Sequence, residues 1–259
     1  VTTKPRLYLR RSVERFVWLS PQMSVHLRQC HQPKAFCKSM TQTVAVIDYG
    51  MGNLHSVESA LRQAGASDVV VTADAEAILA ADRIVFPGVG AIRDCLAEFR
   101  RLGCETTLRL AVDRGTPVLG ICVGMQSLMA RSDENGGVDC LGFFDGTVTR
   151  FPRNHSDTDG TKLKVPHMGW NQVAQSRNHP LWDGIADNAY FYFVHSFFLP
   201  AEESDHVAGS FDYGIKGSAA IAKDNVFATQ FHPEKSHDNG LKLLANFLRW
   251  DGTCSVSYT

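Results

Sequence analysis

Short apolar runs alternate with amphipathic stretches through the first half of the chain. The apolar runs that we expect to form buried strands lie near residues 43–48, 68–72, 82–87 and 117–121. The stretches that we expect to form helices lie near residues 54–64, 91–101 and 104–114. This alternation predicts a doubly wound α/β fold, with a mostly parallel sheet flanked by helices. The active site of such a fold lies at the carboxyl ends of the strands.

The second half of the chain has a different pattern. From about residue 143 to 230, strand-like segments follow one another with few helices, so we expect an antiparallel extension of the sheet. A closing helix is expected over about residues 237–250. The polar stretch from Arg153 to Lys162 predicts an exposed, mobile loop in a hairpin.

A cysteine lies at the turn between an apolar strand and a helix. Gly120 and Gly124 stand two residues on either side of Cys122 and would let the strand and helix approach closely around a strained turn. The amino end of the helix would direct its N–H groups and dipole at the sulfur, which favours the thiolate. We interpret Cys122 as a nucleophile; the alternative is a buried core cysteine.

A histidine and a glutamate follow the last apolar run. Residues 226–231 predict a buried strand, and His232 and Glu234 then project to the same side because they are two positions apart. The carboxylate would orient the imidazole to accept a proton from sulfur, and would stabilise the imidazolium. Alone, the pair could simply end a strand and cap a helix. Together with Cys122 it predicts a catalytic triad.

A glycine-punctuated loop follows an earlier strand. Pro87, Gly88, Val89 and Gly90 precede the cysteine by one strand-and-helix unit. Backbone N–H groups of Gly88 and Val89, with that of Val123, could form an oxyanion hole, in which each donor contributes about 3 kcal/mol to transition-state stabilisation. The alternative is an ordinary strand-to-helix turn.

These motifs resemble those of the class I, triad-type glutamine amidotransferases, and more narrowly those of the glutaminase subunits of imidazole glycerol phosphate synthases, in histidine biosynthesis. The narrower resemblance rests on Pro-His-Met-Gly-Trp-Asn at 166–171, Tyr-Phe-Val-His-Ser at 192–196, Ala-Thr-Gln-Phe-His-Pro-Glu-Lys-Ser at 228–236 and the turn at 48–54. It covers about residues 43 to 250. Val123, where leucine is usual, and Phe197, where tyrosine is common, depart from the pattern without touching the triad.

The resemblance implies a flavodoxin-like fold and a glutaminase reaction without a cofactor. Cys122 would attack the side-chain amide of glutamine to give a glutamyl thioester and ammonia, and water activated by His232 would then release glutamate. The ammonia would pass to a (β/α)₈ barrel cyclase subunit in a heterodimer. Gly88 and Gly90 would let the resting loop point a carbonyl at the oxyanion, so we expect the partner to switch the activity on.

Other positions receive roles from the resemblance alone. Gly90, Gln126 and Ser196 would contact the amino-acid end of glutamine. Gln126 could instead cap the helix surface, and Ser196 could satisfy a strand end. His195 is interpreted as a packed core residue rather than a catalytic one.

The resemblance also suggests where the cyclase subunit would dock. Asn53, Trp170 and Lys235 are the interface candidates. Lys235 could instead be a solvated lysine at a helix start. The chain has no phosphate-binding Gly-x-x-x-x-Gly-Lys loop, so the nucleotide substrate of the synthase would have to bind to the partner.

Two other functional interpretations were weighed. A triad glutaminase of pyridoxal phosphate, anthranilate or purine synthesis would share the cysteine elbow and the His-Pro-Glu segment, but should lack the run at 166–171. A docking or scaffold subunit without activity would be expected to have lost a triad residue. Cys122, His232 and Glu234 are all present.

Residues 1–39 differ from the rest of the chain in charge. They hold eight Lys and Arg residues against Glu14, whereas the remainder holds 18 basic and 26 acidic residues. They contain no long apolar core, which argues against a signal peptide or a membrane span. We expect a disordered extension over 1–40 that arises from the choice of start codon, a domain over 41–251 and a tail over 252–259. An Arg-rich transit peptide and a nucleic-acid-binding arm are the alternatives.

The cysteines and histidines do not form a metal-binding pattern. The N-terminal candidates contain no paired Cys-x-x-Cys, so we expect no metal; they are His26, Cys30, His31 and Cys37. The seven cysteines are scattered, and the nucleophile must be free, which indicates a reducing, cytoplasmic location. We expect neither a nucleic acid nor a membrane as a partner.

Overall fold

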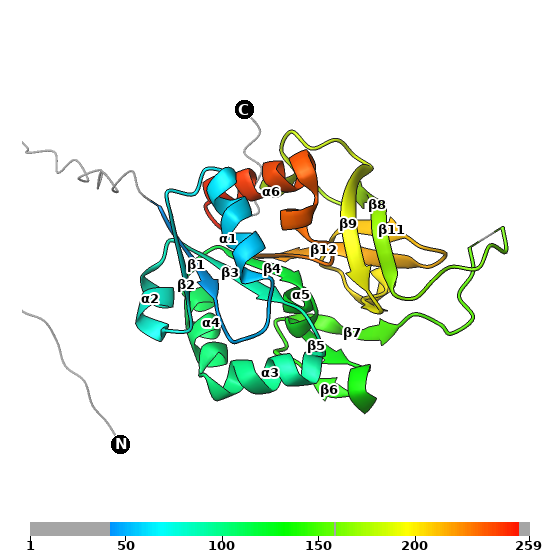
Figure 1. The fold of residues 1–259 in the computed structure, drawn as a ribbon, viewed down its shortest axis with the longest axis horizontal. Coiled ribbons are helices and arrows are strands. Elements are labelled where there is room, and N and C mark those ends of the chain that lie inside the picture. The colour runs from blue at the N-terminus through cyan, green and yellow to red at the C-terminus, as the bar shows by residue number, and fades with distance from the viewer. Residues whose placement is uncertain (1–41, 158, 254–259) are drawn as a thin grey trace, which may run out of the picture. The chain divides into compact units, whose positions relative to one another are not determined.

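A nine-stranded sheet forms the centre of the structure, in the order β2-β1-β3-β4-β13-β12-β11-β8-β9 (Figure 1). The computed structural model describes residues 42–157 and 159–253. The parallel strands are β2 (Asp68–Thr72), β1 (Thr43–Ile47), β3 (Arg83–Gly88), β4 (Val118–Cys122) and β13 (Val226–Thr229). Strands β3, β4 and β13 are buried along their whole length, as parallel strands covered on both faces are.

Helices cover both faces of the parallel part (Figure 1). On one face α1 (Leu54–Gln63) contacts α6 (His237–Arg249). The helices of the other face are α2 (Ala75–Ala80), α3 (Ile92–Arg101), α4 (Cys104–Asp113) and α5 (Val123–Ser127). The doubly wound arrangement is therefore confirmed. Helix α2 was not predicted, because six residues are too few to show a helical period; Asp74 caps it by accepting a hydrogen bond from the Ala77 N–H at 2.8 Å.

The predicted antiparallel extension continues the sheet beyond β13. Its strands are β12 (Lys216–Lys223), β11 (Val207–Asp212), β8 (His167–Gln175) and β9 (Ala189–His195), and each pairs antiparallel with its neighbours. The outermost pair, β8 and β9, runs in continuous register from His167 opposite His195 to Val173 opposite Ala189.

A second, four-stranded sheet was not predicted. Its order is β10 (Phe197–Phe198), β7 (Phe144–Arg150), β5 (Met129–Ser132) and β6 (Val138–Asp139). Three of these strands have only two to four residues and show too few alternations to be recognised in the sequence, whereas β7 lies in the stretch for which strands were predicted. The 3₁₀ turns are η1 (Glu134–Gly136), η2 (Pro180–Trp182), η3 (Ala201–Glu203) and η4 (Pro233–Lys235).

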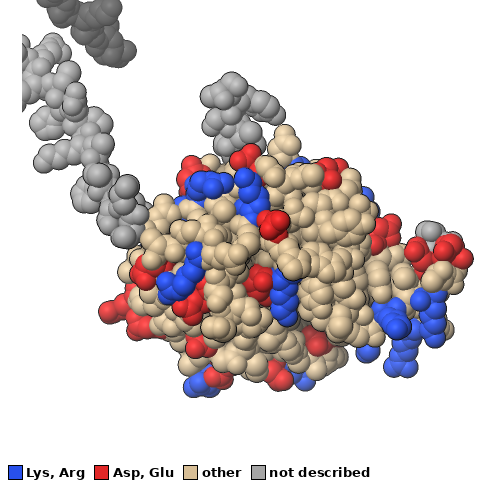
Figure 2. All heavy atoms as spheres, turned by 45° about the horizontal axis from the view of Figure 1, so that its top comes forward, with Lys and Arg blue, Asp and Glu red and all other residues tan. Residues whose placement is uncertain are grey.

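The segment between β7 and β8 protrudes from the two sheets (Figure 1). It folds back on itself through a bridge between Ser156 and Lys162, and most of its described residues are exposed, as predicted. Figure 2 shows that Lys and Arg side chains gather along one side of this hairpin. The predicted N-terminal extension, its four metal candidates and residues 254–259 of the predicted tail lie outside the described residues.

The strand order brings three segments of the candidate site to one edge. Strand β4 lies between β3 and β13, and all three run parallel, so their carboxyl ends meet. Gly88 at the end of β3 is opposite Cys122 at the end of β4, and His232 follows β13. No helix in the described ranges is long and apolar enough to cross a bilayer.

Candidate active site

Cys122 occupies a strained backbone position at the junction of β4 and α5. Its φ is +56° and its ψ is −110°, a left-handed conformation that costs a non-glycine residue on the order of 1–3 kcal/mol. The strain turns the chain sharply from strand to helix and presents the side chain at the edge of the sheet. The predicted elbow is therefore present, although α5 is a single short helix of five residues.

The two glycines beside the elbow are required by close packing. A Cβ added at Gly124 would lie 2.0 Å from the carbonyl oxygen of Phe86, and one at Gly120 would lie 2.9 Å from the Cβ of Ala228. Helix α5 thus packs directly on the backbone of β3, and β4 packs tightly against β13. The sequence-based reason for glycine at both positions holds.

His232 and Glu234 form a buried pair in the turn after β13, which ends at Thr229 rather than at the predicted residue 231. Glu234 lies in the 3₁₀ turn η4, so the turn, and not the alternation of an extended strand, brings the two side chains together. The Nδ1 atom of His232 lies 2.8 Å from Oε1 of Glu234, and the two side chains are 2% and 1% exposed. The N–H of His232 also donates to the Tyr192 carbonyl of β9 at 2.9 Å, and the neighbouring Phe231 ring stacks on Phe191. Sheet contacts therefore fix the backbone of the pair, and the carboxylate fixes the ring.

Charge around the ring favours the imidazolium. Burial lowers the pKa of His232, but its interactions with Cys122 and then with the Glu234 carboxylate outweigh burial, and the pKa is raised above its ordinary value. The Nε2 atom of His232 is buried without a hydrogen bond of good geometry to any described residue. Glu234 thus holds the ring through Nδ1. The other ring nitrogen, Nε2, stays free to exchange a proton.

Two side chains anchor the predicted oxyanion loop by donating hydrogen bonds to its carbonyl groups. The Tyr49 hydroxyl donates to the Pro87 carbonyl at 2.7 Å, and the Cys95 thiol donates to the Val89 carbonyl at 3.3 Å. Gly88 lies against the start of α5, because a Cβ there would come 2.7 Å from the Gly124 nitrogen. The loop therefore packs on the elbow that carries the cysteine.

One cavity, of about 450 Å³, brings most of the predicted site residues together. Those that line it are Val89, Gly90, Cys122, Val123, Gln126, Ser196, His232 and Lys235. Gly88 and Glu234 do not line it; Gly88 packs on the elbow, and Glu234 stands behind His232. The structure thus brings the predicted nucleophile, the predicted base and the amide-binding candidates to one pocket.

Gln126 is held inside this pocket rather than on the helix surface. Its Nε2 donates to the Phe197 carbonyl at 2.9 Å and to Oε1 of Gln230 at 2.9 Å, and the residue is 4% exposed. The alternative interpretation, that it caps the helix surface, is wrong. Ser196 also lines the cavity, and its carbonyl accepts a hydrogen bond from the Phe151 N–H at 3.1 Å.

Sequence reasoning gave no role to several residues of the pocket. Gln230 is fully buried, and its Nε2 lies 3.8 Å from the Cys122 sulfur. Its place just before His-Pro-Glu was the available signal. Glu134, Arg150 and Pro166 also line the cavity, but they come from η1, β7 and the loop before β8, where no pattern indicated proximity to the cysteine.

Of the interface candidates, only Lys235 lines the cavity, and it is exposed. Trp170 on β8 is 45% exposed, beside the still more exposed Met168 and Tyr190, at 61% and 52%. The Trp170 ring stacks on His237, with the planes 3° apart. Asn53 precedes α1 and is half-buried. The outer strand pair β8–β9 therefore presents large apolar side chains to solvent.

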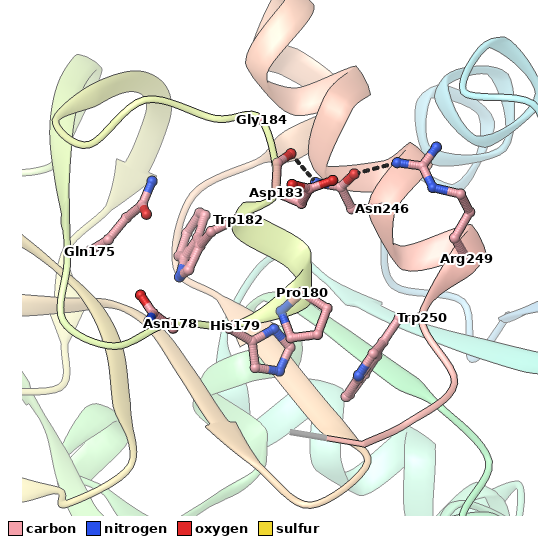
Figure 3. A pocket seen from close by; sticks show the side chains of 10 residues that line it. All are labelled: Gln175, Asn178, His179, Pro180, Trp182, Asp183, Gly184, Asn246, Arg249 and Trp250. Atoms are coloured by element: carbon pink, nitrogen blue, oxygen red, sulfur yellow. Dashed lines mark hydrogen bonds between the residues drawn. The ribbon is translucent and has the colours of Figure 1, made fainter. Parts of the chain in front are cut away.

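A second cavity, of about 560 Å³, lies between η2 and the end of α6 (Figure 3). Its polar groups bond to each other: Asn246 donates to the Asp183 carbonyl at 2.7 Å and accepts from Arg249 at 2.6 Å. Burial lowers the pKa of His179 to about 4, and its Nδ1 accepts from the Leu181 N–H. No cysteine, serine or threonine lines this cavity.

The described residues contain no group of three or more His, Cys, Asp and Glu side chains arranged to hold a metal ion. Four cysteines in this part of the chain are free and buried: Cys95, Cys104, Cys122 and Cys140. The arrangement at Cys122 is thus a thiol, an imidazole and a carboxylate beside an amide-lined pocket. It is suited to acyl transfer from an amide substrate through a thioester.

Residues 45–250 match the glutamine amidotransferase class-I family. The imidazole glycerol phosphate synthase subunit HisH of Pseudomonas savastanoi pv. phaseolicola is 59% identical over 211 residues, which are 82% of this chain and 99% of that protein. Subunit HisH 1 of Pseudomonas aeruginosa is 58% identical over 213 residues, with the same coverage. The crystal structure of a glutamine amidotransferase matches with a TM-score of 0.61 at 18% identity, over 81% of this chain and 99% of that one. That likeness concerns the fold alone.

Proposed function

Because the chain belongs to the class-I glutamine amidotransferase family, we propose that it is the glutaminase subunit of an imidazole glycerol phosphate synthase. It hydrolyses glutamine to glutamate and ammonia and passes the ammonia to a cyclase subunit, in histidine biosynthesis. The observation that carries this proposal is Cys122 on a strained elbow, in one cavity with the buried His232–Glu234 pair. The curated relatives, nearly all of whose length is matched, support the narrower assignment.

The reaction begins with attack of the Cys122 sulfur on the side-chain amide carbon of glutamine. The imidazolium of His232 then gives its proton to the leaving nitrogen, ammonia departs, and a glutamyl thioester remains. Water next attacks the thioester while His232 accepts its proton, and glutamate is released with the thiolate restored. Glu234, 2.8 Å from Nδ1, keeps the ring oriented and stabilises its charged form in both steps.

The oxyanion of each tetrahedral intermediate is held by backbone N–H groups. We assign these donors to Gly88, Val89 and Val123, since the loop after β3 packs on the start of α5. Gly90, Gln126 and Ser196 bind the amino-acid end of glutamine, because they line the same cavity. A role in binding agrees with the burial of Gln126 and its bonds to two fixed groups, Phe197 and Gln230.

The partner is a (β/α)₈ barrel cyclase, which forms a heterodimer with this chain. It docks on the exposed edge formed by β8 and β9, where Met168, Trp170 and Tyr190 leave apolar surface in solvent. Asn53 and Lys235 complete the contact, and Lys235 does so at the mouth of the cavity. The complex works in the cytoplasm, where the catalytic thiol stays reduced.

Docking also switches the glutaminase on. The loop from Pro87 to Gly90 carries two glycines, and its anchoring bonds reach Pro87 and Val89 from behind, so the peptide between Gly88 and Val89 is the one that reorients. A thousandfold stimulation corresponds to about 4 kcal/mol in favour of the competent loop. We expect low glutamine turnover by the isolated chain, more in the complex, and most with nucleotide bound. Equal turnover in all three states would remove the switch.

The domain itself spans residues 41–251, preceded by the basic extension and followed by a short tail. A chain that begins at Met40 is expected to keep its melting temperature and its partner affinity, because β1 begins at Thr43 and the family match begins at residue 45. A drop of several degrees in melting temperature would place part of the extension in the fold.

The decisive experiment replaces the nucleophile in the complex. Cys122→Ala should abolish glutamine-dependent synthesis of imidazole glycerol phosphate, while synthesis from added ammonium salts continues, since only the ammonia source is lost. Cys104→Ala, at a buried cysteine of α4 outside the cavity, is the matched control and should retain both activities. Glutamine hydrolysis near the wild-type rate in the Cys122 variant would show that the nucleophile is misassigned.

A second experiment tests the docking edge. Trp170→Ala should weaken binding of the cyclase subunit at least tenfold, because aromatic anchors carry much of the energy of an interface. Leu110→Ala is the control: Leu110 is 43% exposed, similar to Trp170, but lies on α4. Equal affinities for both variants would place the interface elsewhere.

The alternative function is that of a glutaminase subunit of another amidotransferase. If the partner subunit of an anthranilate or pyridoxal phosphate synthase, and not the cyclase, stimulated glutamine turnover, the assignment would change to that amidotransferase.

A further inference from the structure

Four groups form a continuous hydrogen-bond chain between the outer strands and the glutamine pocket. Nδ1 of His195 lies 2.8 Å from the Phe197 carbonyl oxygen, and Nε2 of the same ring lies 3.0 Å from Nδ1 of His167. Nε2 of His167 lies 3.4 Å from the amide nitrogen of Asn171, which also donates to the Asp212 carbonyl at 2.7 Å. His167 and His195 are 2% and 6% exposed.

The chemistry of these groups allows only one direction of donation. A carbonyl accepts, so Nδ1 of His195 must carry the proton, and in a neutral ring its Nε2 is then an acceptor. Nδ1 of His167 must therefore donate, and its Nε2 must accept from the Asn171 amide. Burial lowers the pKa of His195 to about 3 and that of His167 to about 4, with smaller contributions from neighbouring histidines, so both rings are neutral at physiological pH.

The inner end of the hydrogen-bond chain lies at the pocket, because His195 and Phe197 line the cavity, and it reaches Gln126 through a shared acceptor. The Phe197 carbonyl accepts from His195 and also from Nε2 of Gln126, at 2.9 Å. Gln126 is joined in turn to Gln230, whose amide nitrogen lies 3.8 Å from the Cys122 sulfur. The position of this carbonyl therefore determines where the Gln126 amide stands in the cavity.

The outer end of the chain belongs to the strand that we assign to docking. His167 and Asn171 lie on β8, and their side chains point to the opposite side from Met168 and Trp170, which are exposed. A displacement of β8 would move both sets of side chains together, because successive residues of a strand share one backbone. Strand β8 thus carries the exposed apolar side chains on one face and the outer end of the hydrogen-bond series on the other.

We propose that Asn171, His167 and His195 are positioning residues, which fix the Phe197 carbonyl and through it the Gln126 amide that binds glutamine. This series of hydrogen bonds couples the geometry of the substrate pocket to strand β8. This proposal rests on the glutaminase function proposed above. It predicts that removing one of these hydrogen bonds weakens glutamine binding more than it slows the chemical step.

The first test uses the unaltered full-length chain. Nitrogen-detected NMR of the histidine rings should show the Nδ1–H tautomer for both His167 and His195 at pH 7. A ring that is protonated at Nε2, or that is charged, would overturn the proposed direction of the chain. This measurement needs no glutaminase activity, so it stays decisive even if the proposed function fails.

The second test compares two substitutions at one position. His195→Leu should raise the KM for glutamine at least tenfold while kcat stays within threefold, whereas His195→Asn, whose amide can donate to the Phe197 carbonyl, should recover most of the affinity. His179→Asn is the control, a buried histidine outside the pocket, and should leave the KM unchanged. An unchanged KM in a folded His195→Leu protein would refute the positioning role. The role would also be refuted if the Leu and Asn variants lost the same affinity for glutamine and their losses matched the decrease in their melting temperatures.

Discussion

The Tyr49 hydroxyl donates a hydrogen bond of 2.7 Å to the carbonyl of Pro87, which joins the turn after β1 to the carboxyl end of β3. The tyrosine is 1% exposed, and burial raises the pKa of its hydroxyl, so it stays protonated and able to donate. Tyr49→Phe keeps the ring and removes the donor. We expect the free energy of unfolding to fall by about 1 kcal/mol, the usual worth of one such bond.

Urea unfolding of this variant would be compared with Tyr190→Phe, since Tyr190 is 52% exposed. A change of less than about 0.5 kcal/mol is expected for the exposed tyrosine. Partner-stimulated glutamine turnover should also fall below that of the unaltered chain in the Tyr49 variant, because the bond anchors Pro87, the first residue of the oxyanion loop. Equal stability of the two variants, with unaltered turnover in the Tyr49 variant, would contradict this account.

Gly124 is expected to tolerate no side chain. A Cβ there would meet the Phe86 carbonyl oxygen at 2.0 Å, and neither backbone can move without disturbing the elbow. Gly124→Ala should lower the free energy of unfolding by about 3 kcal/mol, as overpacking of a core does, and reduce glutamine turnover by more than tenfold.

The matched variant for this test is Gly115→Ala. Gly115 has a φ of +79° but open space around its Cβ position, so its cost is the left-handed backbone alone, about 1 kcal/mol, without loss of turnover. Stability and turnover measured for both variants would separate the steric effect from the backbone effect. A fully active Gly124→Ala protein would show that the elbow can shift.

The candidate triad could be recognised in the sequence because its residues stand in local patterns. Gly120, Cys122 and Gly124 indicate the elbow by themselves, and His232 and Glu234 stand two positions apart after a buried apolar run. That these residues meet depends on the parallel pairing of β4 with β13. The sequence did not indicate this pairing, because residues 226–229 lie in the stretch that was predicted to be antiparallel.

Contacts between distant segments left no such local trace. Gln230 reaches Gln126 across 104 positions, and Arg150 enters the cavity from β7, whose pairing in a separate small sheet no pattern predicted. The hydrogen bond between His167 and His195 likewise depends on the register of β8 against β9. A single sequence shows that such residues are polar or apolar, but the partner of each depends on the three-dimensional arrangement.

Three buried histidines are expected to make the fold sensitive to acid. Burial lowers the pKa of His167 and His179 to about 4 and that of His195 to about 3. The contribution of each neutral ring to stability is fully present above the ordinary histidine pKa near 6.5. It is lost as the pH falls through the lower pKa that the ring has in the folded state. Between about pH 6 and pH 4 the unfolded chain binds up to three more protons, so stability should fall by as much as about 4 kcal/mol per pH unit.

Chemical unfolding at several pH values would measure this slope. His179→Asn keeps an acceptor for the Leu181 N–H but cannot titrate, so it should reduce the slope by about one proton equivalent. His55→Asn, at an exposed histidine, should leave the slope unchanged. A stability that does not depend on pH between 6 and 4 would mean that these rings are charged in the fold.

His232 is expected to behave in the opposite sense. Burial alone would lower its pKa, but the negative sulfur of Cys122, followed by Glu234, raises it above the ordinary value near 6.5. NMR titration of the wild-type chain should therefore find the ring still charged above pH 7. Its contribution to stability is fully present below about pH 6.5 and is lost as the pH rises through the folded value.

Removing the sulfur separates the two causes. In Cys122→Ala the effect of burial remains and the largest opposing effect is gone, so the pKa of His232 should fall, and the loss of stability at alkaline pH should shrink with it. Glu234→Gln should also lower the pKa, but by less, because the sulfur contributes more than the carboxylate. The reverse order of the two variants, or a wild-type ring that titrates at or below 6.5, would show that the thiolate and imidazolium are not paired in the resting enzyme.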